Sequence, residues 1–456
     1  MSMSLAPKNW LRSRAAIALL FLTLLGGGIR LFVLEQTYPI GLVGDEVHYM
    51  RVAGNLATGF GAHSNPNWRV WRPPGHPFVI SLLFEDGADG AQNLHRVLGL
   101  QVVLGTLIVL LTALLGEALF DFRTGLVAGL IAALYPNFVA FSTYLWSENL
   151  YTVFLLGGLL TAVRSQHSLG FGLPVVAGVI FGLGALTREA SLLAAGASAF
   201  FWIATAGSDA RYRQVARGAV MLGVALLCVL PWTARNHALY GRLIPVSTIG
   251  WFAAGEGNTF EEASWLDVDG PRNEAFRNRY LGTRNEMDRM DFARRYTLEQ
   301  IAAEQPTWIF KKAVRSPVQL FNPYSSILHK IHHGAYGEVS RASLYGVAVV
   351  SMLPYLAVFL LGTLGIAAAR GDGRLLLPCV LLGVFVSMHI LANADVRFRL
   401  PWIPIFIIYT SHALLGGRRL VASMGVSRRI ALAGVWLFFL GLCIPYGGEH
   451  LRTLFP

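Results

Sequence analysis

Two adjacent carboxylates, Asp45 and Glu46, follow the first long apolar stretch of the chain, in "GLVGDEVHYMRVAGNLATG". A carboxylate can take a proton from an attacking hydroxyl group, as a general base does. An acid pair can also hold a divalent cation, because Mg²⁺ and Ca²⁺ prefer oxygen ligands. His48, Tyr49 and Arg51 follow on what we expect to be a short helix. Glu46-x-His48 is only a weak metal motif, and an interfacial histidine is the alternative. Asp45 can also simply cap that helix.

Other ionisable residues lie at the ends of apolar stretches far apart in the sequence. They are Glu148 in "YLWSENLY", Arg188 and Glu189 in "LTREAS", Arg235 in "PWTARN", and Arg397 and Arg399 in "NADVRFRLPWIP". Single residues of this kind are common as interface anchors of membrane helices. As a set they suit another chemistry, because arginine binds a phosphate group with paired donors. Acids and arginines together therefore indicate transfer from a phosphate leaving group, and a lipid tail on the substrate would explain their position.

Composition shows which elements must position these residues. The chain has 456 residues, of which 54% are hydrophobic and 14% charged. Repeated apolar stretches of about 20 residues have the length of transmembrane helices, and the alternating pattern of a membrane β-barrel is absent. We predict an all-α polytopic membrane protein with one domain over residues 1–456. The net charge of +11 comes largely from short loops and does not indicate nucleic-acid binding.

About eleven transmembrane helices are predicted, the first of them an uncleaved span preceded by Lys8, Arg12 and Arg14. The predicted spans are 15–34, 95–116, 125–142, 149–164, 172–187, 190–206, 217–234, 342–367, 375–392, 400–416 and 429–446. Spans 172–187 and 190–206 are short, so a hairpin that does not fully cross is an alternative. Glycines in "GLVAGL" and "GVIFGLGAL" predict close helix packing.

Basic loops define the predicted orientation. With the N-terminus inside, loops such as "DARYRQVAR", "ARGDGR" and "GGRRLVASMGVSRR" also lie inside, as the positive-inside rule requires. Two long loops, 35–94 with the acidic motif and 235–341, then lie outside. The acids and arginines described above converge on this outer face. We expect a multi-pass protein of the plasma membrane, which is the inner membrane of a bacterium.

The second long loop, 235–341, combines charge with aromatic side chains. Its stretch from Glu286 to Pro323 predicts helices at the membrane surface, with Pro306 and Pro317 as breaks. His329, His332 and His333 follow. They suggest zinc only weakly, because no cysteine or second histidine pair accompanies them.

The same segments resemble the GT-C superfamily of integral-membrane glycosyltransferases, in particular glycosyltransferase family 39. This group includes protein O-mannosyltransferases and lipid A aminoarabinose transferases. The resemblance begins at "GDEVHYMRVAGNLATG" and continues through "RPPGHPFVISLLF", "LYPNFVAFSTYLWSENLY", "GLGALTREASLL" and "PWTARNHALYGRLIPVST". It ends with "VRFRLPWIPIFI" and so covers most of the chain.

The resemblance implies inverting transfer of a hexosyl or pentosyl group from a polyprenyl-phosphate donor to an acceptor on the outer face. It implies that Asp45 is the general base, with Glu46 and Glu148 as further catalytic acids. It assigns the donor phosphate to Arg188, Arg397 and Arg399, and we add Arg235 because of its position. The larger relatives have a soluble C-terminal domain that this chain lacks, so acceptor recognition does not follow from the resemblance.

Three functional classes are therefore compared. The first is the glycosyltransferase, with a glycan, lipid or protein as acceptor, membrane lipids as further partners, no certain cofactor, and a divalent cation as an open alternative. The second is a transporter or flippase for lipid-linked sugars, which would place ionisable groups at mid-membrane and often shows two related halves. The third is a non-catalytic scaffold, which needs no acid beside phosphate-binding arginines. The residues favour the first class and leave the sugar open.

Overall fold

The computed structural model of the chain describes residues 6–85, 87–166, 168, 170–262, 264–267, 269–369 and 376–452. This part of the chain is helical, and the predicted class of all-α polytopic membrane protein is confirmed. The side chains of Lys8, Arg12 and Arg14, and most of the predicted basic loop "ARGDGR", lie outside the described residues.

The predicted spans coincide with helices. The helices at these positions are α1 (Ala6–Thr37), α4 (Gly90–Leu119), α5 (Phe122–Leu134), α7 (Glu148–Ser165), α8 (Gly172–Thr187), α9 (Ala190–Ala204), α10 (Ser208–Tyr240), α16 (Arg341–Ala368), α17 (Leu376–Leu391), α18 (Ile403–Ala422) and α19 (Val426–Phe438). The π-helix η3 (Phe439–Cys443) and α20 (Ile444–Arg452) continue α19. In the described residues, six segments are long and apolar enough to cross a membrane, and four apolar helices are shorter. The number of eleven crossings stays a prediction.

One predicted span, 125–142, is interrupted. The helix α5 ends before Tyr135, whose ψ of 114° is extended, and α6 (Pro136–Phe141) begins with a proline. A proline disfavours the helical conformation of the residue before it, while it fits well at the first position of a new helix. The chain therefore turns at Tyr135.

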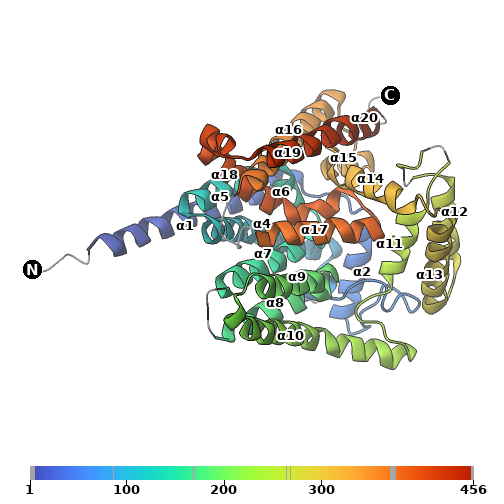
Figure 1. Cartoon of the computed structure of the whole chain (residues 1–456). Helices are drawn as coiled ribbons and strands as arrows, with labels where there is room; N and C mark the ends of the chain where they lie inside the picture. Colours follow the sequence, from blue (N-terminus) through green and yellow to red (C-terminus); the bar gives the residue numbers. More distant parts are fainter. Residues whose placement is uncertain are drawn as a thin grey trace, which may run out of the picture.

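Shorter elements carry the predicted loops. They are α2 (Asp45–Ala57), α3 (Gly75–Ser81), α11 (Ile249–Asn258), α12 (Pro271–Gly282), α13 (Glu286–Ala303), α14 (Trp308–Phe321), α15 (Ser326–His332) and the 3₁₀ helix η2 (Val396–Trp402). In Figure 1, α2 and α11 to α15 gather at the right-hand end of the molecule, while the N-terminal end of α1 projects at the left. The loops at 35–94 and 235–341 thus meet at one end of the helix bundle.

The predicted breaks in the second loop are partly correct. Pro306 lies between α13 and α14, as predicted, but Pro317 lies inside α14. The prediction of a break at Pro317 is wrong. A proline removes one main-chain hydrogen bond from a helix, and α14 continues for only one further turn, to Phe321.

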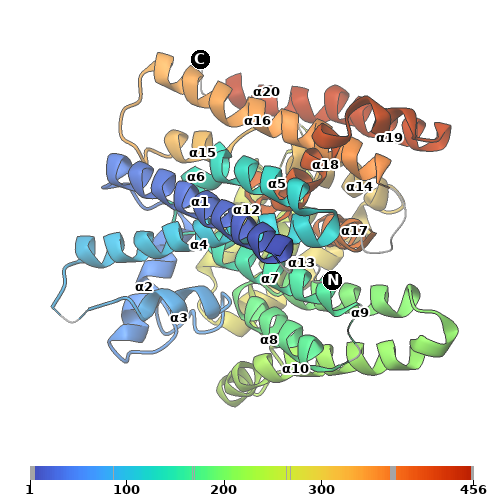
Figure 2. The same ribbon diagram turned by 90° about the vertical axis from the view of Figure 1, so that its left-hand side faces the viewer.

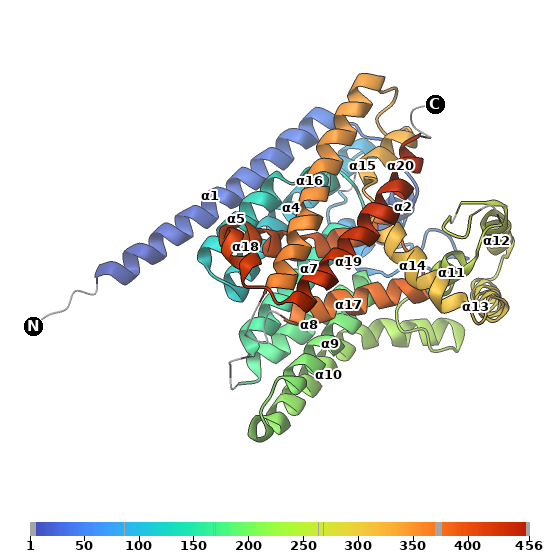
Figure 3. The ribbon, with the colours of Figure 1, turned by 45° about the horizontal axis from the view of Figure 1, so that its top comes forward.

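The long helices of the bundle pack against one another. The helix α1 lies against α4 and α5 (Figure 2), and α10 packs on α8 and α9 on the opposite side from α16, α18 and α19 (Figure 3). The predicted close packing of the glycine segments is confirmed at Gly125, where a Cβ atom would lie 2.4 Å from the carbonyl oxygen of Ala113. Arg30 is fully buried and donates hydrogen bonds to the carbonyl groups of Gly26, Ala132 and Ala133, which ties α1 to α5.

Candidate active site

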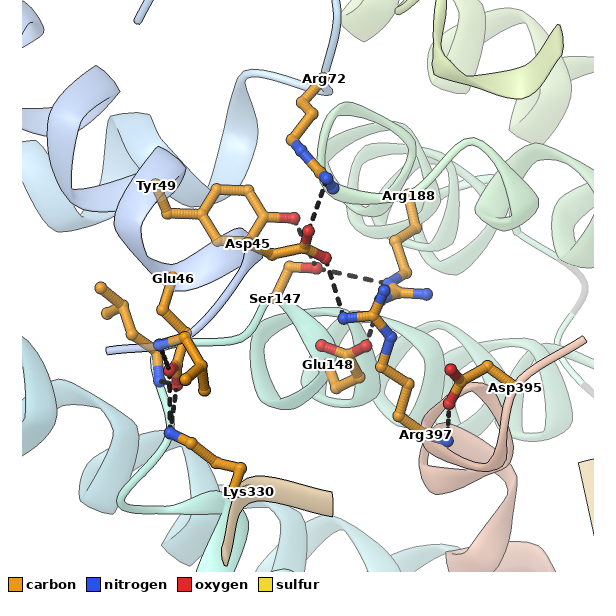
Figure 4. A network of polar contacts seen from close by, with 12 residues as sticks. Asp45, Glu46, Tyr49, Arg72, Ser147, Glu148, Arg188, Lys330, Asp395 and Arg397 are labelled. Carbon is orange, nitrogen blue, oxygen red and sulfur yellow. Dashed lines mark hydrogen bonds and ion pairs between the residues drawn. The ribbon is translucent and has the colours of Figure 1, made fainter. Parts of the chain in front are cut away.

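Asp45 lies between two arginines from distant parts of the chain. Arg72 Nη2 is 2.6 Å from Asp45 Oδ1, and Arg397 Nη1 is 2.8 Å from Asp45 Oδ2. Each carboxylate oxygen therefore accepts a hydrogen bond from a different guanidinium group (Figure 4). The side chains of Asp45, Arg72 and Arg397 are 20%, 14% and 25% exposed, so the group is sheltered but accessible to a ligand.

Local conformation directs these side chains toward one another. The N-cap of α2 is Gly44, with a φ of 58° that favours glycine, and no side chain caps this helix. Asp45 is the first residue of α2, and its carboxylate points away to the arginines. The interpretation of Asp45 as a simple cap is therefore wrong. Arg397 lies at the start of η2, where Asp395 accepts a hydrogen bond from the main-chain N–H of Arg397 at 2.8 Å.

The two arginines control the charge of Asp45. Burial alone would raise the pKa of Asp45, but the positive charges of Arg72 and Arg397 outweigh burial and hold the pKa well below its ordinary value. Asp45 is thus ionised at neutral pH. In this arrangement it is a weak proton acceptor.

A second ion pair lies beside the first. Arg188 donates a hydrogen bond to Glu148, and its Nε is 3.4 Å from the hydroxyl of Ser147. The Tyr49 hydroxyl also donates to Ser147, at 3.4 Å. The positive charge of Arg188 further lowers the pKa of Asp45. The structure therefore brings together four predicted residues, Asp45, Glu148, Arg188 and Arg397.

Glu46 faces the other way. Lys330 Nζ lies 2.8 Å from both carboxylate oxygens of Glu46, and both side chains are fully buried. Glu46 also accepts hydrogen bonds from the main-chain N–H groups of Val43 and Leu145. These contacts tie the start of α2 to α15 and to the segment before α7. The geometry gives Glu46 the contacts of a positioning residue, and a direct part in the chemistry stays a prediction. The two acids do not share a metal site in this arrangement.

We predict that Lys330→Met lowers the melting temperature strongly, because it leaves the Glu46 carboxylate buried without its partner. Breaking a buried ion pair from one side costs about 3–5 kcal/mol. The double variant Glu46→Gln with Lys330→Met should recover much of the loss, since it leaves no buried charge. Thermal unfolding of the purified protein in detergent measures both effects. A Lys330→Met variant as stable as the original protein would contradict this role.

Two arginines that the sequence predicts as phosphate-binding residues lie apart from the cluster of Asp45, Arg72, Glu148, Arg188 and Arg397. Arg399 is buried, its guanidinium lies over the ring of Tyr355, and it donates to the carbonyl groups of Leu320, Asn322 and Tyr324. Arg235 stacks over Trp232 and donates to the carbonyl group of Arg69. Neither arginine contacts Asp45 or Glu148. Their predicted role in phosphate binding stays a prediction, and their observed contacts are structural.

Arg72 was not predicted from the sequence. It stands directly before the prolines of "RPPGHP", which by themselves indicate only a turn. Its guanidinium lies over the ring of Trp71, 4.4 Å from the centroid. An arginine next to tryptophan in the loop that carries the acidic pair was the available signal.

The histidines have mainly packing contacts. The ring of His48 lies 4.9 Å from that of Trp71 in an edge-on arrangement. Burial, together with the charge of Arg72, lowers the pKa of His48 to about 4, so this ring is neutral at pH 7. The rings of His329 and His333 lie 4.2 Å apart. Among the residues that the structure describes, no three His, Cys, Asp or Glu side chains are grouped to hold a metal ion.

Two hollows flank the segment that leads to Arg397. An apolar groove of about 920 Å³ lies between α9, α11, α13 and α17, and its lining includes Leu193, Trp251, Leu298 and Leu391. A polar cavity of about 700 Å³ is lined by residues that include Asp267, Asn322, His329, Asp395 and Glu449. The groove reaches Leu391 and Ala392, whereas the cavity begins at Ala394. Residues 391–396 thus separate an apolar from a polar hollow.

Comparison with known proteins identifies the fold. A family model described as dolichyl-phosphate-mannose-protein mannosyltransferase matches residues 71–234, which is well under half of the chain. The oligosaccharyltransferase of Archaeoglobus fulgidus in the apo form superposes with a TM-score of 0.56 at 16% identity, over 98% of this chain and 56% of that one. This chain has the GT-C fold. The fold implied by the resemblance to the GT-C superfamily is confirmed.

Other solved structures are also similar to this chain. The Archaeoglobus fulgidus enzyme AglB in complex with an inhibitory peptide and a dolichol-phosphate gives a TM-score of 0.55 at 16% identity, over 98% of this chain and 56% of that one. The chain thus spans little more than half the length of these oligosaccharyltransferases. ArnT from Cupriavidus metallidurans in the apo state gives a TM-score of 0.41 at 14% identity, over 91% of this chain and 80% of that one. No curated protein sequence matches the chain.

Proposed function

We propose that the chain transfers a sugar from a polyprenyl-phosphate donor to a hydroxyl group of an acceptor. The observation that carries this proposal is the cluster in which Arg72, Arg188 and Arg397 surround the carboxylates of Asp45 and Glu148. Three guanidinium groups at one point suit a phosphate leaving group. A carboxylate between them suits a proton acceptor for the attacking hydroxyl.

The reaction forms one bond and breaks one. The acceptor oxygen attacks the anomeric carbon, the bond from that carbon to the phosphate oxygen breaks, and the anomeric configuration inverts. Asp45 takes the proton of the acceptor hydroxyl. The electron pair of the broken bond leaves with the polyprenyl phosphate, whose negative charge Arg72, Arg188 and Arg397 stabilise. The geometry assigns no step to Arg235 or Arg399.

The two hollows suit the two substrates. The lining of the apolar groove includes Glu189, which follows Arg188 in the sequence. A lipid tail in the groove would therefore bring its phosphate toward Arg188 and the other two arginines of the cluster. The polar cavity on the other side of residues 391–396 would receive a hydroxyl-bearing acceptor. The lipid-linked donor and the acceptor would then meet near Arg397, which is paired with Asp45.

The proposal places the cluster on the extracytoplasmic side. The helix α2, which begins with Asp45, lies in the half of the molecule away from the N-terminal end of α1 (Figure 1). Basic loops predict that this N-terminus is inside. A reporter fused after Arg213 should therefore read cytoplasmic, and one inserted near Asn278 should read external. Reporters that read from the same side would contradict this topology.

The alternative function is that of a flippase. Transfer breaks the sugar–phosphate bond of the donor, whereas a flippase breaks no bond. Purified protein would be reconstituted with a labelled polyprenyl-phosphate sugar and an extract of envelope acceptors. Transfer releases one polyprenyl phosphate for each glycosylated acceptor. A flippase moves the lipid across the bilayer with its sugar–phosphate bond intact, and that result would exclude the proposed function.

A further inference from the structure

Both oxygens of the Asp45 carboxylate are occupied in this structure. Arg72 and Arg397 each donate a hydrogen bond to a separate oxygen, at 2.6 and 2.8 Å. A general base must accept a hydrogen bond from the hydroxyl group that it deprotonates. Each oxygen could accept a second hydrogen bond, but a guanidinium group on each of them keeps Asp45 a weak proton acceptor. Asp45 becomes a stronger base when at least one arginine takes another partner.

Arg72 and Arg397 each have a hydrogen-bond donor that is not used among the described residues. The Nε groups of Arg72 and Arg397 are buried and have no hydrogen-bond partner in the described part of the chain. Elsewhere in the residues that the structure describes, the Nε groups of four further arginines also have no partner, namely Arg30, Arg217, Arg289 and Arg315. Arg72 and Arg397 differ from these in their position beside Asp45. These unused donors lie next to Asp45 and fit the oxygens of a phosphate group, which an arginine can bind through two parallel hydrogen bonds.

We propose that Arg72 and Arg397 form an exchange switch, in which the donor phosphate displaces Asp45 from both guanidinium groups and so frees the carboxylate for the acceptor hydroxyl. This inference rests on the proposed function. It makes Asp45 and the donor phosphate competitors for the same two arginines. Donor binding therefore comes first, and Asp45 acts as a base only when the leaving group is in place. Hydroxyl groups that enter without a donor meet a carboxylate that is paired with two guanidinium groups and is a weak base.

The affinity for undecaprenyl phosphate shows whether Asp45 competes with phosphate for the arginines or holds them in position for it. If Asp45 competes with phosphate, Asp45→Asn should bind undecaprenyl phosphate more tightly than the original protein, by about 10-fold, which equals about 1.4 kcal/mol. If Asp45 instead holds the arginines in position for phosphate, the same variant should bind it more weakly. The measurement is the dissociation constant of undecaprenyl phosphate in detergent micelles, together with the melting temperature of each variant.

A matched control removes the carboxylate from another aspartate–arginine ion pair. Asp291 pairs with Arg242 at 2.9 Å, and neither contacts the cluster. Asp291→Asn should leave the dissociation constant unchanged. Unchanged or weaker binding by a folded Asp45→Asn would overturn the switch, and transfer by the original protein would then leave the proposed function intact. If the original protein neither binds undecaprenyl phosphate nor transfers sugar, the proposed function fails and the switch with it.

A second measurement needs no change at Asp45. Because the Arg72 guanidinium lies 4.4 Å from the centroid of the Trp71 ring, its movement should alter the emission of Trp71. Undecaprenyl phosphate should therefore change the tryptophan fluorescence of the original protein, and Trp71→Phe should remove most of that change. Saturable binding of labelled undecaprenyl phosphate without a change at Trp71 would show that Arg72 stays on Asp45, which contradicts the switch.

Discussion

Asp45→Asn is expected to lower the transfer of sugar from a polyprenyl-phosphate donor by about 100-fold or more, because a positioned general base contributes roughly 10²- to 10⁴-fold to a rate. Asparagine has nearly the shape of aspartate but takes up no proton. The protein should stay folded, because the N-cap of α2 is Gly44 and the Asp45 side chain caps nothing. Turnover, donor affinity and melting temperature are measured on the same preparation.

Glu46→Gln provides the comparison for this result. Glu46 is the neighbour of Asp45 but is bound to Lys330, so its replacement should lower the melting temperature more than Asp45→Asn does. The turnover of the Glu46→Gln protein that remains folded should fall much less. Near-normal turnover of Asp45→Asn would remove Asp45 from the role of base.

Arg72→Ala and Arg397→Ala are each expected to weaken donor binding and transfer by about 10- to 100-fold, because a hydrogen bond to a charged group contributes about 1.5–3 kcal/mol. Arg397→Lys should rescue only in part, since lysine cannot donate two parallel hydrogen bonds. Titration with labelled donor gives the affinity, and single-turnover rates give the transfer step.

Arg399 and Arg235 are the matched controls for the arginine variants. Arg399→Ala removes hydrogen bonds to three main-chain carbonyl groups, so it should lower stability and leave the donor affinity of the folded protein nearly normal. Arg235→Ala should also bind donor normally. Normal donor titrations for Arg72→Ala and Arg397→Ala would place the phosphate elsewhere on the protein.

Hydropathy was enough to predict the fold class, because a helix that crosses hydrocarbon must be apolar and satisfy its own main-chain hydrogen bonds. The interruption at Tyr135 depends on a single proline and was not predicted. Pro317 shows the opposite case, in which a proline lies within a helix. Proline limits hydrogen bonding locally, but packing decides whether the chain turns.

The site was only partly predictable, because the sequence does not show in which direction each side chain points. Asp45 and Glu46 are adjacent in sequence, but successive residues of a helix point about 100° apart, so one faces the arginines and the other faces Lys330. Arg397 and Arg399 likewise belong to one short motif and have different surroundings. A sequence shows which residues lie near the membrane surface, whereas the partner of each side chain depends on tertiary packing. Arg72 joins the cluster through its ion pair with Asp45, the first residue of α2.

The most direct test of the proposed site is the position of the lipid phosphate in a structure of the protein with undecaprenyl phosphate. We expect the phosphate within hydrogen-bond distance of Arg72, Arg188 and Arg397, the lipid tail in the groove beside Leu193 and Leu391, and Asp45 released from both arginines. A phosphate bound at Arg235 or Arg399, with Asp45 still paired to Arg72 and Arg397, would contradict this expectation.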